Sequence, residues 1–383
     1  MISPKHHYIF SFTFLSFVLI PLTTSSFLAT IKTADALTLK QSPPVALLTG
    51  ATGRTGQIVT NELLKKGFQV RIFCRDGQKA KEIFRNSDDN GIDYLKNIEF
   101  CQGDLGNEND IQAAFSNTSK KLTHVIFMAG GEDADYRVVS YQGLAKFAQK
   151  ATAVECNTIR HFVVISTAWC TKPYSIASLL FNTLYFDTLP MASYYLGEQA
   201  LRKAAAGVTD KNSSLNYVIL RAGGLNSDER YAEKYPDAAT MGLTYQQGDT
   251  FDFFGIAGRP GMSRSQLANA VLSAVDVEGQ YTVEVTGSGN VDLNDSSFYQ
   301  ELRQDDNSKA VIANNRDDDD DTAVFDTHTQ AVKQLKNTAI AASLGGIAMI
   351  GIYGWFQGLV LLLSLDAIII LLWSRFFANK QAY

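Results

Sequence analysis

The sequence predicts an α/β fold built on a doubly wound parallel sheet. Short apolar runs alternate along the chain with longer segments of helical periodicity, which is typical of parallel strands joined by crossover helices. A glycine-rich turn joins the first apolar run to the first helix. Apolar segments at both ends of the 383 residues leave about 250 residues, enough for one large core.

The apolar runs define the expected strands in chain order. They lie at residues 45–48, 69–74, 97–101, 124–128, 161–165, 216–220 and 281–285. The segments of helical periodicity or composition lie between them, at residues 57–66, 78–85, 110–115, 198–206 and 263–275. Together these elements place the globular domain at residues 44–290.

The charge and the cysteines argue against two kinds of partner. The chain has 34 basic and 39 acidic side chains, a formal net charge of -5, and no basic stripe that would suit nucleic acid. Its cysteines, Cys74, Cys101, Cys156 and Cys170, are too scattered for a disulfide framework and lack the paired spacing of a zinc site. We therefore expect no nucleic-acid partner and no metal.

Residues 1–36 have the three-part layout of a secretory signal. Lys5 precedes an apolar stretch at 8–22, and small and hydroxylated residues follow at 23–26. An uncleaved N-terminal anchor is the alternative. Phe27 directly after a cleavage point also resembles the bipartite leader of algae with secondary plastids. The protein is expected at a membrane, in the secretory pathway or in a plastid.

The other end of the chain is also apolar. Residues 338–373 contain one charge, Asp366, and are long enough for one tilted transmembrane helix or for two tight ones. Too few polar residues interrupt the stretch to give a helix with a wet face. Residues 291–332 lose apolar periodicity and include an unbroken acidic run at 317–321, which predicts a solvated acidic linker before a membrane anchor.

The glycine turn after the first strand has the spacing that a bound dinucleotide requires. Gly50 allows a sharp turn, Gly53 leaves room for a pyrophosphate against the backbone, and Gly56 lets the helix pack closely on the strand. The N-terminus of that helix adds N–H donors and a positive dipole. This predicts a Rossmann-type domain with cofactor contacts from Thr49, Gly50, Thr52, Gly53, Arg54, Thr55 and Gly56.

The end of the second strand decides between NAD and NADP. An acid there would bind the adenosine ribose, but this sequence has Arg75, nineteen residues after Gly56. Arg54 projects from the glycine turn toward the same region, and two guanidinium groups suit a 2′-phosphate. Asp76 stands one position late for the acid. The expected cofactor is NADP, with NAD possible.

Polar and small residues follow the next two strands. Asp104 and Leu105 come after the third strand, and Ala129 and Gly130 come after the fourth. Carboxyl ends of parallel strands are where open α/β sheets bind ligands. We expect Asp104 to accept from the adenine amino group and the small residues to leave room for the ribose. The alternative for Asp104 is a turn cap.

These motifs together resemble the atypical short-chain dehydrogenase/reductase family, NmrA-like branch, especially its NAD(P)-binding members in plants and algae. The resemblance is carried by residues 49–56, 74–76, 103–105, 166–167, 197–202, 220–225, 247–249 and 262–264. It implies a Rossmann core with a small C-terminal part that faces the substrate. It does not imply one reaction, because the relatives include reductases, redox-responsive regulators and photosystem assembly factors.

The resemblance also defines the expected catalytic residues. Short-chain dehydrogenases that transfer hydride use a serine and a YxxxK pair, in which the lysine lowers the tyrosine pKa. This chain has no YxxxK: Glu198 follows Tyr194 by four residues, and Gln199 follows Tyr195. Ser166 fits the polar position beside the nicotinamide. Tyr194 or Tyr195 is the candidate proton donor, unless both only pack or line a pocket.

Two functions are consistent with these features. The first is a membrane-anchored NADP(H)-binding oxidoreductase that acts on a small or lipid-like substrate. The second is a non-catalytic NADP(H)-binding module for redox sensing or for the assembly of membrane proteins, such as photosystems. The missing lysine favours the second function, and the intact cofactor residues favour neither.

Overall fold

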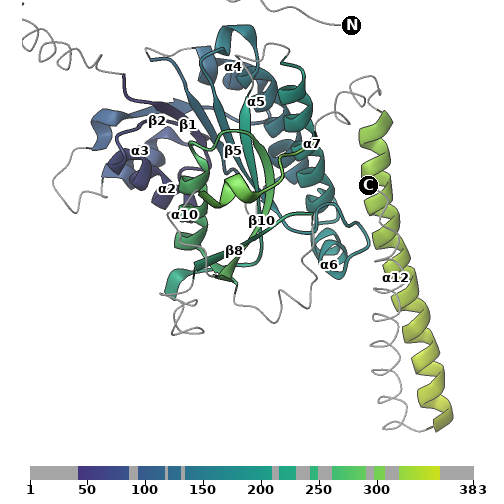
Figure 1. Cartoon of the computed structure of the whole chain (residues 1–383). Coiled ribbons are helices and arrows are strands. Elements are labelled where there is room, and N and C mark those ends of the chain that lie inside the picture. The colour runs from purple at the N-terminus through teal and green to yellow at the C-terminus, as the bar shows by residue number, and fades with distance from the viewer. Residues whose placement is uncertain are drawn as a thin grey trace, which may run out of the picture. The chain divides into compact units, whose positions relative to one another are not determined.

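The computed structural model describes residues 42–85, 94–116, 120–130, 134–208, 215–229, 242–248, 261–289, 297–306 and 319–353. Within these residues the chain forms an eight-stranded sheet with the strand order β3-β2-β1-β4-β5-β6-β10-β8, and a two-stranded sheet of β7 and β9 (Figure 1). The predicted N-terminal segment, residues 1–36, lies outside the described residues.

Seven strands of the large sheet are parallel, as the alternating pattern predicts. They are β1 (Val45–Thr49), β2 (Gln69–Cys74), β3 (Ile98–Gln102), β4 (His124–Phe127), β5 (His161–Thr167), β6 (Asn216–Ala222) and β10 (Gln280–Gly289). The eighth, β8 (Gly242–Gln246), runs antiparallel to β10 at the edge. The short strands β7 (Leu225–Asn226) and β9 (Met262–Ser263) pair beyond the end of β6.

Helices cover both faces of the sheet, which explains why its central strands are apolar runs rather than alternating patterns. On one face lie α2 (Arg54–Lys65), α3 (Gly77–Arg85) and α10 (Arg264–Ala274), and on the other lie α4 (Glu108–Ser116), α5 (Leu144–Ala151) and α7 (Pro190–Ala206) (Figure 1). Ile72 and Phe73 are successive residues of β2, so they point to opposite faces of the sheet. Ile72 belongs to one hydrophobic core and Phe73 to the other.

The remaining described elements are short, apart from the last helix. They are η1 (Tyr94–Asn97), the π-helix η2 (Arg137–Gly143), η3 (Val154–Cys156), α6 (Ile176–Leu184), η6 (Ser297–Glu301) and α12 (Asp319–Tyr353). Helix α7 approaches η2 closely because it has Gly197 at the contact: a Cβ there would lie 2.0 Å from the Ser140 carbonyl oxygen. This contact fixes the rotation of α7.

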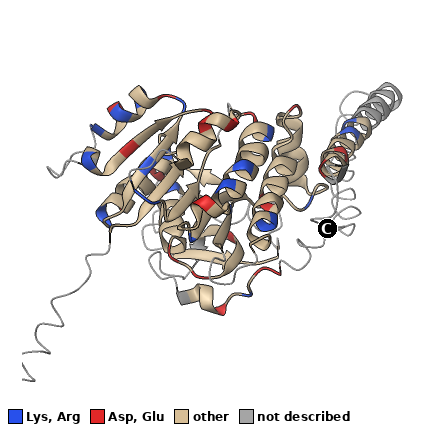
Figure 2. Cartoon of the chain, turned by 90° about the horizontal axis from the view of Figure 1, so that it is seen from above, with Lys and Arg blue, Asp and Glu red and all other residues tan. Residues whose placement is uncertain are grey.

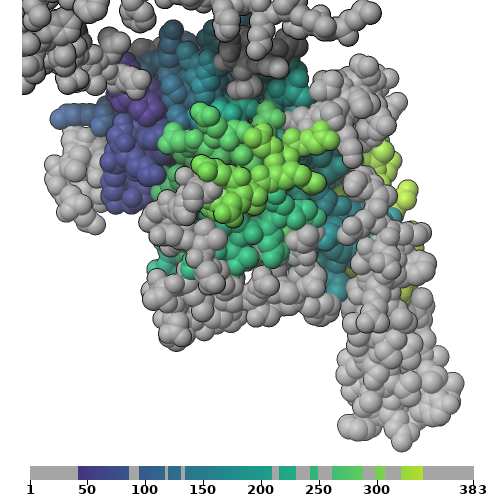
Figure 3. Space-filling model, in the orientation of Figure 1, coloured from purple at the N-terminus to yellow at the C-terminus, as the bar shows by residue number. Residues whose placement is uncertain are grey.

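The late helix α10 begins with a capping box. The Ser263 hydroxyl accepts from the Gln266 backbone N–H at 3.1 Å, and the Ser263 N–H donates to Gln266 Oε1 at 2.9 Å. The segment that follows runs over the face of the molecule in Figure 3, where β10 and η6 appear in green. Phe298 and Tyr299 of η6 pack on the core, so residues beyond 290 are part of this face.

The predicted C-terminal transmembrane segment is wrong. Among the described residues, no helix is long and apolar enough to cross a membrane. Helix α12 begins in the acidic run at Asp319 and continues past Lys336 without a break, so its polar first half and the start of the predicted anchor form one helix. Residues 354–373 of the predicted anchor lie outside the described residues.

The first half of α12 packs on the domain. Val324 joins the apolar cluster at Leu189 and Leu196, and Val332 joins a cluster with Leu179 of α6. Figure 2 shows that the positions of basic and acidic residues are interspersed along the described ribbon. A local excess of positive charge therefore requires a few basic residues to lie close together in the fold.

Candidate functional site

The glycine turn is built for close backbone approach. Gly50 has a φ of 72°, which favours glycine, and a Cβ there would lie 2.5 Å from the Met128 carbonyl oxygen. A Cβ on Gly56 would lie 2.1 Å from the Gly50 carbonyl oxygen. Gly53 is the N-cap of α2, and no side chain caps this helix. The first N–H groups of α2 therefore suit an anion such as a pyrophosphate.

A cavity of about 940 Å³ lies at the carboxyl ends of the parallel strands. All twelve residues predicted for cofactor binding line it: Thr49, Gly50, Thr52, Gly53, Arg54, Thr55, Gly56, Arg75, Asp104, Leu105, Ala129 and Gly130. The volume is in the upper range for small-molecule and cofactor sites. The crevice lies where β1 has β2 on one side and β4 on the other, the switch point of the sheet.

The end of the cavity at β2 is positively charged. Arg54 and Arg75 are exposed and line it, and Lys79 adds a third cation that the sequence did not single out. The Asp76 carboxylate accepts from the Lys79 backbone N–H at 2.9 Å, so it caps the first turn of α3. Asp76 lines the cavity as well, but Arg54, Arg75 and Lys79 outnumber it at this end, which suits a phosphate better than a ribose hydroxyl.

Two predicted residues also hold the walls of the site. Thr49 Oγ1 accepts from the backbone N–H groups of Met128 and Ala129 at 3.1 and 3.2 Å, which ties the end of β1 to the end of β4. Asp104 Oδ1 accepts from the Gly106 N–H at 2.7 Å, the turn cap that the sequence left as an alternative to adenine binding. Both residues line the cavity as well.

The structure separates the three catalytic candidates. Tyr194 lines the cavity, and a Cβ on Gly130 would lie 3.2 Å from its hydroxyl oxygen. Burial raises the pKa of Tyr194 above its usual value, so the phenol stays protonated at neutral pH. Tyr195 instead packs with Leu196 and Val324, against α12. Only Tyr194 is placed to meet a ligand.

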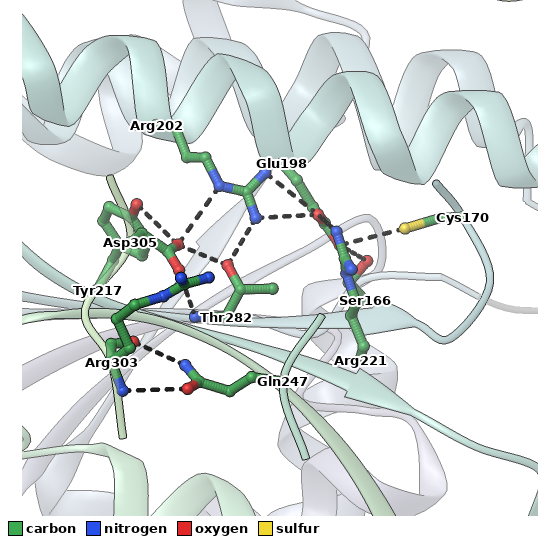
Figure 4. Close-up of polar contacts among 10 residues, drawn as sticks. All are labelled: Ser166, Cys170, Glu198, Arg202, Tyr217, Arg221, Gln247, Thr282, Arg303 and Asp305. Carbon is green, nitrogen blue, oxygen red and sulfur yellow. Dashed lines mark hydrogen bonds and ion pairs between the residues drawn. The ribbon is translucent and has the colours of Figure 1, made fainter. Parts of the chain in front are cut away.

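Ser166 belongs to a different group of side chains. Its hydroxyl donates to Glu198 Oε1 at 2.6 Å, it is 4% exposed, and it does not line the described cavity (Figure 4). Its neighbour Ile165 lines the cavity instead. The serine expected beside the nicotinamide is therefore engaged by a buried carboxylate.

Glu198 is the centre of this buried network. It is completely buried and accepts from Arg221 through two hydrogen bonds of 2.9 and 2.6 Å (Figure 4). Arg202 donates to Oε2, which Arg221 also uses, at 3.2 and 3.3 Å. Burial alone would raise the pKa of Glu198, but the two guanidinium groups and the Ser166 hydroxyl lower it to about 2. Glu198 is therefore ionised and holds α7 to β5 and β6.

Asp305, in the segment after η6, extends the network. It accepts from Arg202 at 3.4 Å, from the Tyr217 hydroxyl at 3.0 Å and from the Thr282 hydroxyl at 2.6 Å (Figure 4). Its other oxygen accepts from the Thr282 N–H at 3.1 Å. These contacts join the segment after η6 to the strands and to α7.

Several residues that line the cavity were not predicted from the sequence. They come from five elements or loops of the described chain and are Lys79, Tyr136, Ile165, Leu225, Arg264 and Leu267. Arg264 stands in the Met262-Ser263-Arg264 motif, so its pattern was visible, but only the fold places its side chain at the cavity. The others are apolar or surface-type residues that look like ordinary core or helix positions in sequence.

Comparisons with known proteins agree with this site. The model of an NAD(P)H-binding family matches residues 50–278. The protein named TIC 62, chloroplastic, from Arabidopsis thaliana is 27% identical over 223 residues, which are 54% of this chain and 30% of that protein. Its namesake from Oryza sativa subsp. japonica is 26% identical, over 58% of this chain and 42% of that protein. The chain thus spans less than half the length of these relatives.

Solved structures with related folds are more distant. The oxidoreductase ylbE from Lactococcus lactis is 13% identical with a TM-score of 0.47, over 68% of this chain and 99% of that chain. The Bordetella bronchiseptica enzyme WbmG in complex with NAD is 16% identical with a TM-score of 0.41, over 70% of this chain and 81% of that chain. These likenesses add nothing to the identification.

The identification depends on the family match, which covers most of the globular domain, and on the plant relatives. Both agree with the glycine cradle, whose missing Cβ atoms leave the space that a dinucleotide needs. The chain belongs to the NAD(P)H-binding family of atypical short-chain dehydrogenase/reductase proteins, the NmrA-like group of plant type.

Proposed function

We propose that the protein is an NADP(H)-dependent oxidoreductase that reduces a small carbonyl or quinone compound. The observation that carries this proposal is the single cavity that joins the cations at β2 to the Tyr194 hydroxyl beside Gly130. One end suits the 2′-phosphate of NADP, and the other has room and a proton donor for a substrate.

The residues of the chain divide the work along this cavity. The start of α2 binds the pyrophosphate, and Arg54, Arg75 and Lys79 bind the 2′-phosphate. When NADPH is bound, it supplies the hydride. Tyr194, which is protonated at neutral pH, donates its proton to the oxygen of the reduced carbonyl. Because burial raises its pKa and no lysine follows it at the YxxxK spacing, it is a weaker acid than the tyrosine of a YxxxK pair.

The full chain tests this proposal. We expect NADPH to bind more tightly than NADH in a fluorescence titration, and we expect NADPH oxidation with some members of a panel of quinones, aldehydes and enones. Tyr194→Phe should lower kcat by about 100-fold. Tyr195→Phe is the matched control, since Tyr195 packs on α12, and it should keep kcat. Equal activity of both variants with the parent would exclude Tyr194 as the acid.

A second function has its own supporting observation. The Ser166 hydroxyl donates to Glu198 instead of lining the cavity. Glu198 stands four residues after Tyr194, where the YxxxK pattern has its lysine. Both features support a non-catalytic NADP(H) module for redox sensing or protein assembly. Tight NADPH binding without turnover of any compound in the panel would favour this function over the oxidoreductase.

We also propose that the protein acts in a plastid. The curated relatives are named as chloroplastic proteins, from Arabidopsis thaliana, Pisum sativum and Oryza sativa. A C-terminal fluorescent fusion of the full chain should coincide with chlorophyll fluorescence in a photosynthetic host. Retention of the fusion in the endoplasmic reticulum would contradict this location.

A further inference from the structure

Arg264 lies at the cavity but takes no part in the function proposed so far. It is the first residue of α10, directly after β9, and its side chain lines the cavity with Leu225 and Leu267. The guanidinium is partly buried, and its Nη1 atom is inaccessible to solvent and has no hydrogen-bonding partner among the described residues. A buried donor of this kind is unfavourable unless a ligand completes it.

The nearest acidic partner is already engaged. Burial raises the pKa of Asp228, but hydrogen bonds from Ser265 and Ser263 outweigh burial and lower the pKa, and the charge of Arg264 contributes least. Its two oxygens accept from the Ser265 N–H at 3.1 Å and from the Ser265 hydroxyl at 2.9 Å. No hydrogen bond joins Arg264 to Asp228 in the described part of the chain. The Nη1 group of Arg264 is thus the donor that an anion in the cavity would satisfy.

Arg264 lies far across the sheet from Arg75, while its helix α10 packs on α2, which begins at Arg54. Strand β9, directly before Arg264, pairs with β7, which follows β6 after two residues, whereas Arg75 directly follows β2. Four strand spacings of about 4.8 Å separate β2 from β6, so the two backbones lie about 19 Å apart across the sheet. The other residues of β5, β7 and α10 that line the cavity are apolar: Ile165, Leu225 and Leu267.

We propose that Arg264 binds the carboxylate of the substrate, so that the substrate class is a carbonyl compound with a carboxylate group. The inference rests on the oxidoreductase function proposed above for the use of the carbonyl, but not for the binding of the anion. A planar guanidinium matches a carboxylate with two parallel hydrogen bonds. The apolar wall contacts the rest of the substrate, and its carbonyl faces Tyr194.

Binding of matched pairs to the full chain tests the inference. Pyruvate and phenylpyruvate are titrated calorimetrically, each beside its methyl ester, with and without saturating NADP⁺. We expect at least one oxo acid to bind about tenfold more tightly than its ester. Arg264→Gln should abolish that difference, and Arg264→Lys should restore part of it. Arg85→Gln, which removes an exposed charge outside the cavity lining, should leave the difference unchanged.

The outcomes are distinguishable from failure of the proposed function. Oxo acid binding that depends on Arg264, without any NADPH oxidation, would keep this inference and remove the oxidoreductase. Equal affinity for acids and esters, or no binding of either, would overturn it. A tenfold loss of NADP⁺ affinity in Arg264→Gln with unchanged oxo acid binding would also overturn it, because Arg264 would then serve the cofactor phosphates.

Discussion

Glycines at the turn after β1 have two separate duties. Gly53 faces the cavity, and a Cβ there would lie 3.2 Å from the Gly50 carbonyl oxygen, a contact that small movements can relieve. Gly56 faces the backbone of the turn itself, where a Cβ would lie 2.1 Å from the same oxygen. The first glycine leaves space for a ligand, and the second holds the helix against the strand.

This difference gives a testable result for Gly56→Ala. The added methyl group must push α2 away from the turn, so we expect the free energy of unfolding to fall by about 3 kcal/mol. NADPH affinity should fall as well, because the first turn of α2 moves. Gly207→Ala is the control: a Cβ there would have ordinary contacts at 3.5 Å, and denaturant unfolding should change by less than about 1 kcal/mol.

The lowered pKa of Glu198 predicts how the stability of the fold depends on acid pH. Its pKa in the folded state is about 2, below its usual 4.5, so ionised Glu198 stabilises the fold above pH 4.5, and this contribution is lost as pH falls toward 2. A shift of this size corresponds to about 3 kcal/mol. Glu198→Gln should destabilise the protein by a similar amount at pH 7.

The measurement is urea unfolding of the parent and Glu198→Gln between pH 7 and 3. The stability difference between them should shrink at the acid end of the series. A constant difference over the whole range would mean that the ionised carboxylate of Glu198 does not stabilise the fold. Asp305→Asn, which also faces Arg202, reports whether the outer part of the network responds separately.

Among the helices and strands, features made by contiguous residues were predictable from the sequence. Features that depend on contacts between residues far apart in sequence were not. The phosphate cradle was predictable because its turn, glycines and helix are contiguous. The choice between Tyr194 and Tyr195 was not, because adjacent helical residues point about 100° apart. The rotation of α7 depends on Gly197 packing against Ser140, a contact 57 residues apart in sequence. Likewise, Glu198 engages Ser166 across 32 residues.

The acidic run was misleading for a different reason. Aspartates at 317–321 resemble a solvated linker, but acidic residues also stabilise a helix N-terminus through the helix dipole. The structure begins α12 at Asp319, and the residues that follow dock on α6 and α7. Strand β8 was missed because its sequence, Gly-Leu-Thr-Tyr-Gln, is not an apolar run, as suits a strand at the edge of the sheet.

Docking of α12 should depend on pH through His328. This residue is 1% exposed, and its Nδ1 lies 2.8 Å from Asn182 Nδ2. An amide nitrogen only donates, so Nδ1 must accept and the ring must be neutral. Burial lowers the pKa of His328 from 6.5 to about 4. Docking is thus fully stable above pH 6.5 and weakens as pH falls toward 4, by about 2 kcal/mol at pH 5.

Hydrogen exchange of the amides in residues 321–336 measures this docking. Exchange should be faster at pH 5 than at pH 7 after correction for the intrinsic rates. His328→Gln keeps an acceptor for Asn182 but does not titrate in this range, so exchange in that variant should lose the additional pH dependence. The same acid response in His328→Gln as in the parent would show that other groups control α12.

At the scale of the whole molecule, cofactor binding should stabilise the entire domain. The cavity contacts β1, β2, β5, α2, α7, α10 and the turn that follows β4, so unfolding of any of these releases the ligand. At a concentration one hundred times its Kd, a ligand adds about 2.7 kcal/mol to the free energy of unfolding. For a domain of this size, we expect NADPH to raise the Tm by about 5 °C.

Thermal unfolding of the full chain with equal concentrations of NADPH and NADH checks this expectation. NADPH should give the larger shift, and Arg75→Gln should reduce the NADPH shift to that of NADH because the 2′-phosphate loses a guanidinium partner. Arg85→Gln is again the control. Equal shifts for the two cofactors in the parent would contradict the assignment of NADP.

The contacts of Asp305 determine where the chain can be cut. A polypeptide ending at residue 290 keeps every strand and the whole cavity, yet it loses the carboxylate that Arg202, Tyr217 and Thr282 share. It also loses Phe298 and Tyr299 from the core face. Such a fragment would be about 3 kcal/mol less stable or worse, and its aggregation could be mistaken for a cofactor requirement. Recombinant work should extend the chain beyond residue 305.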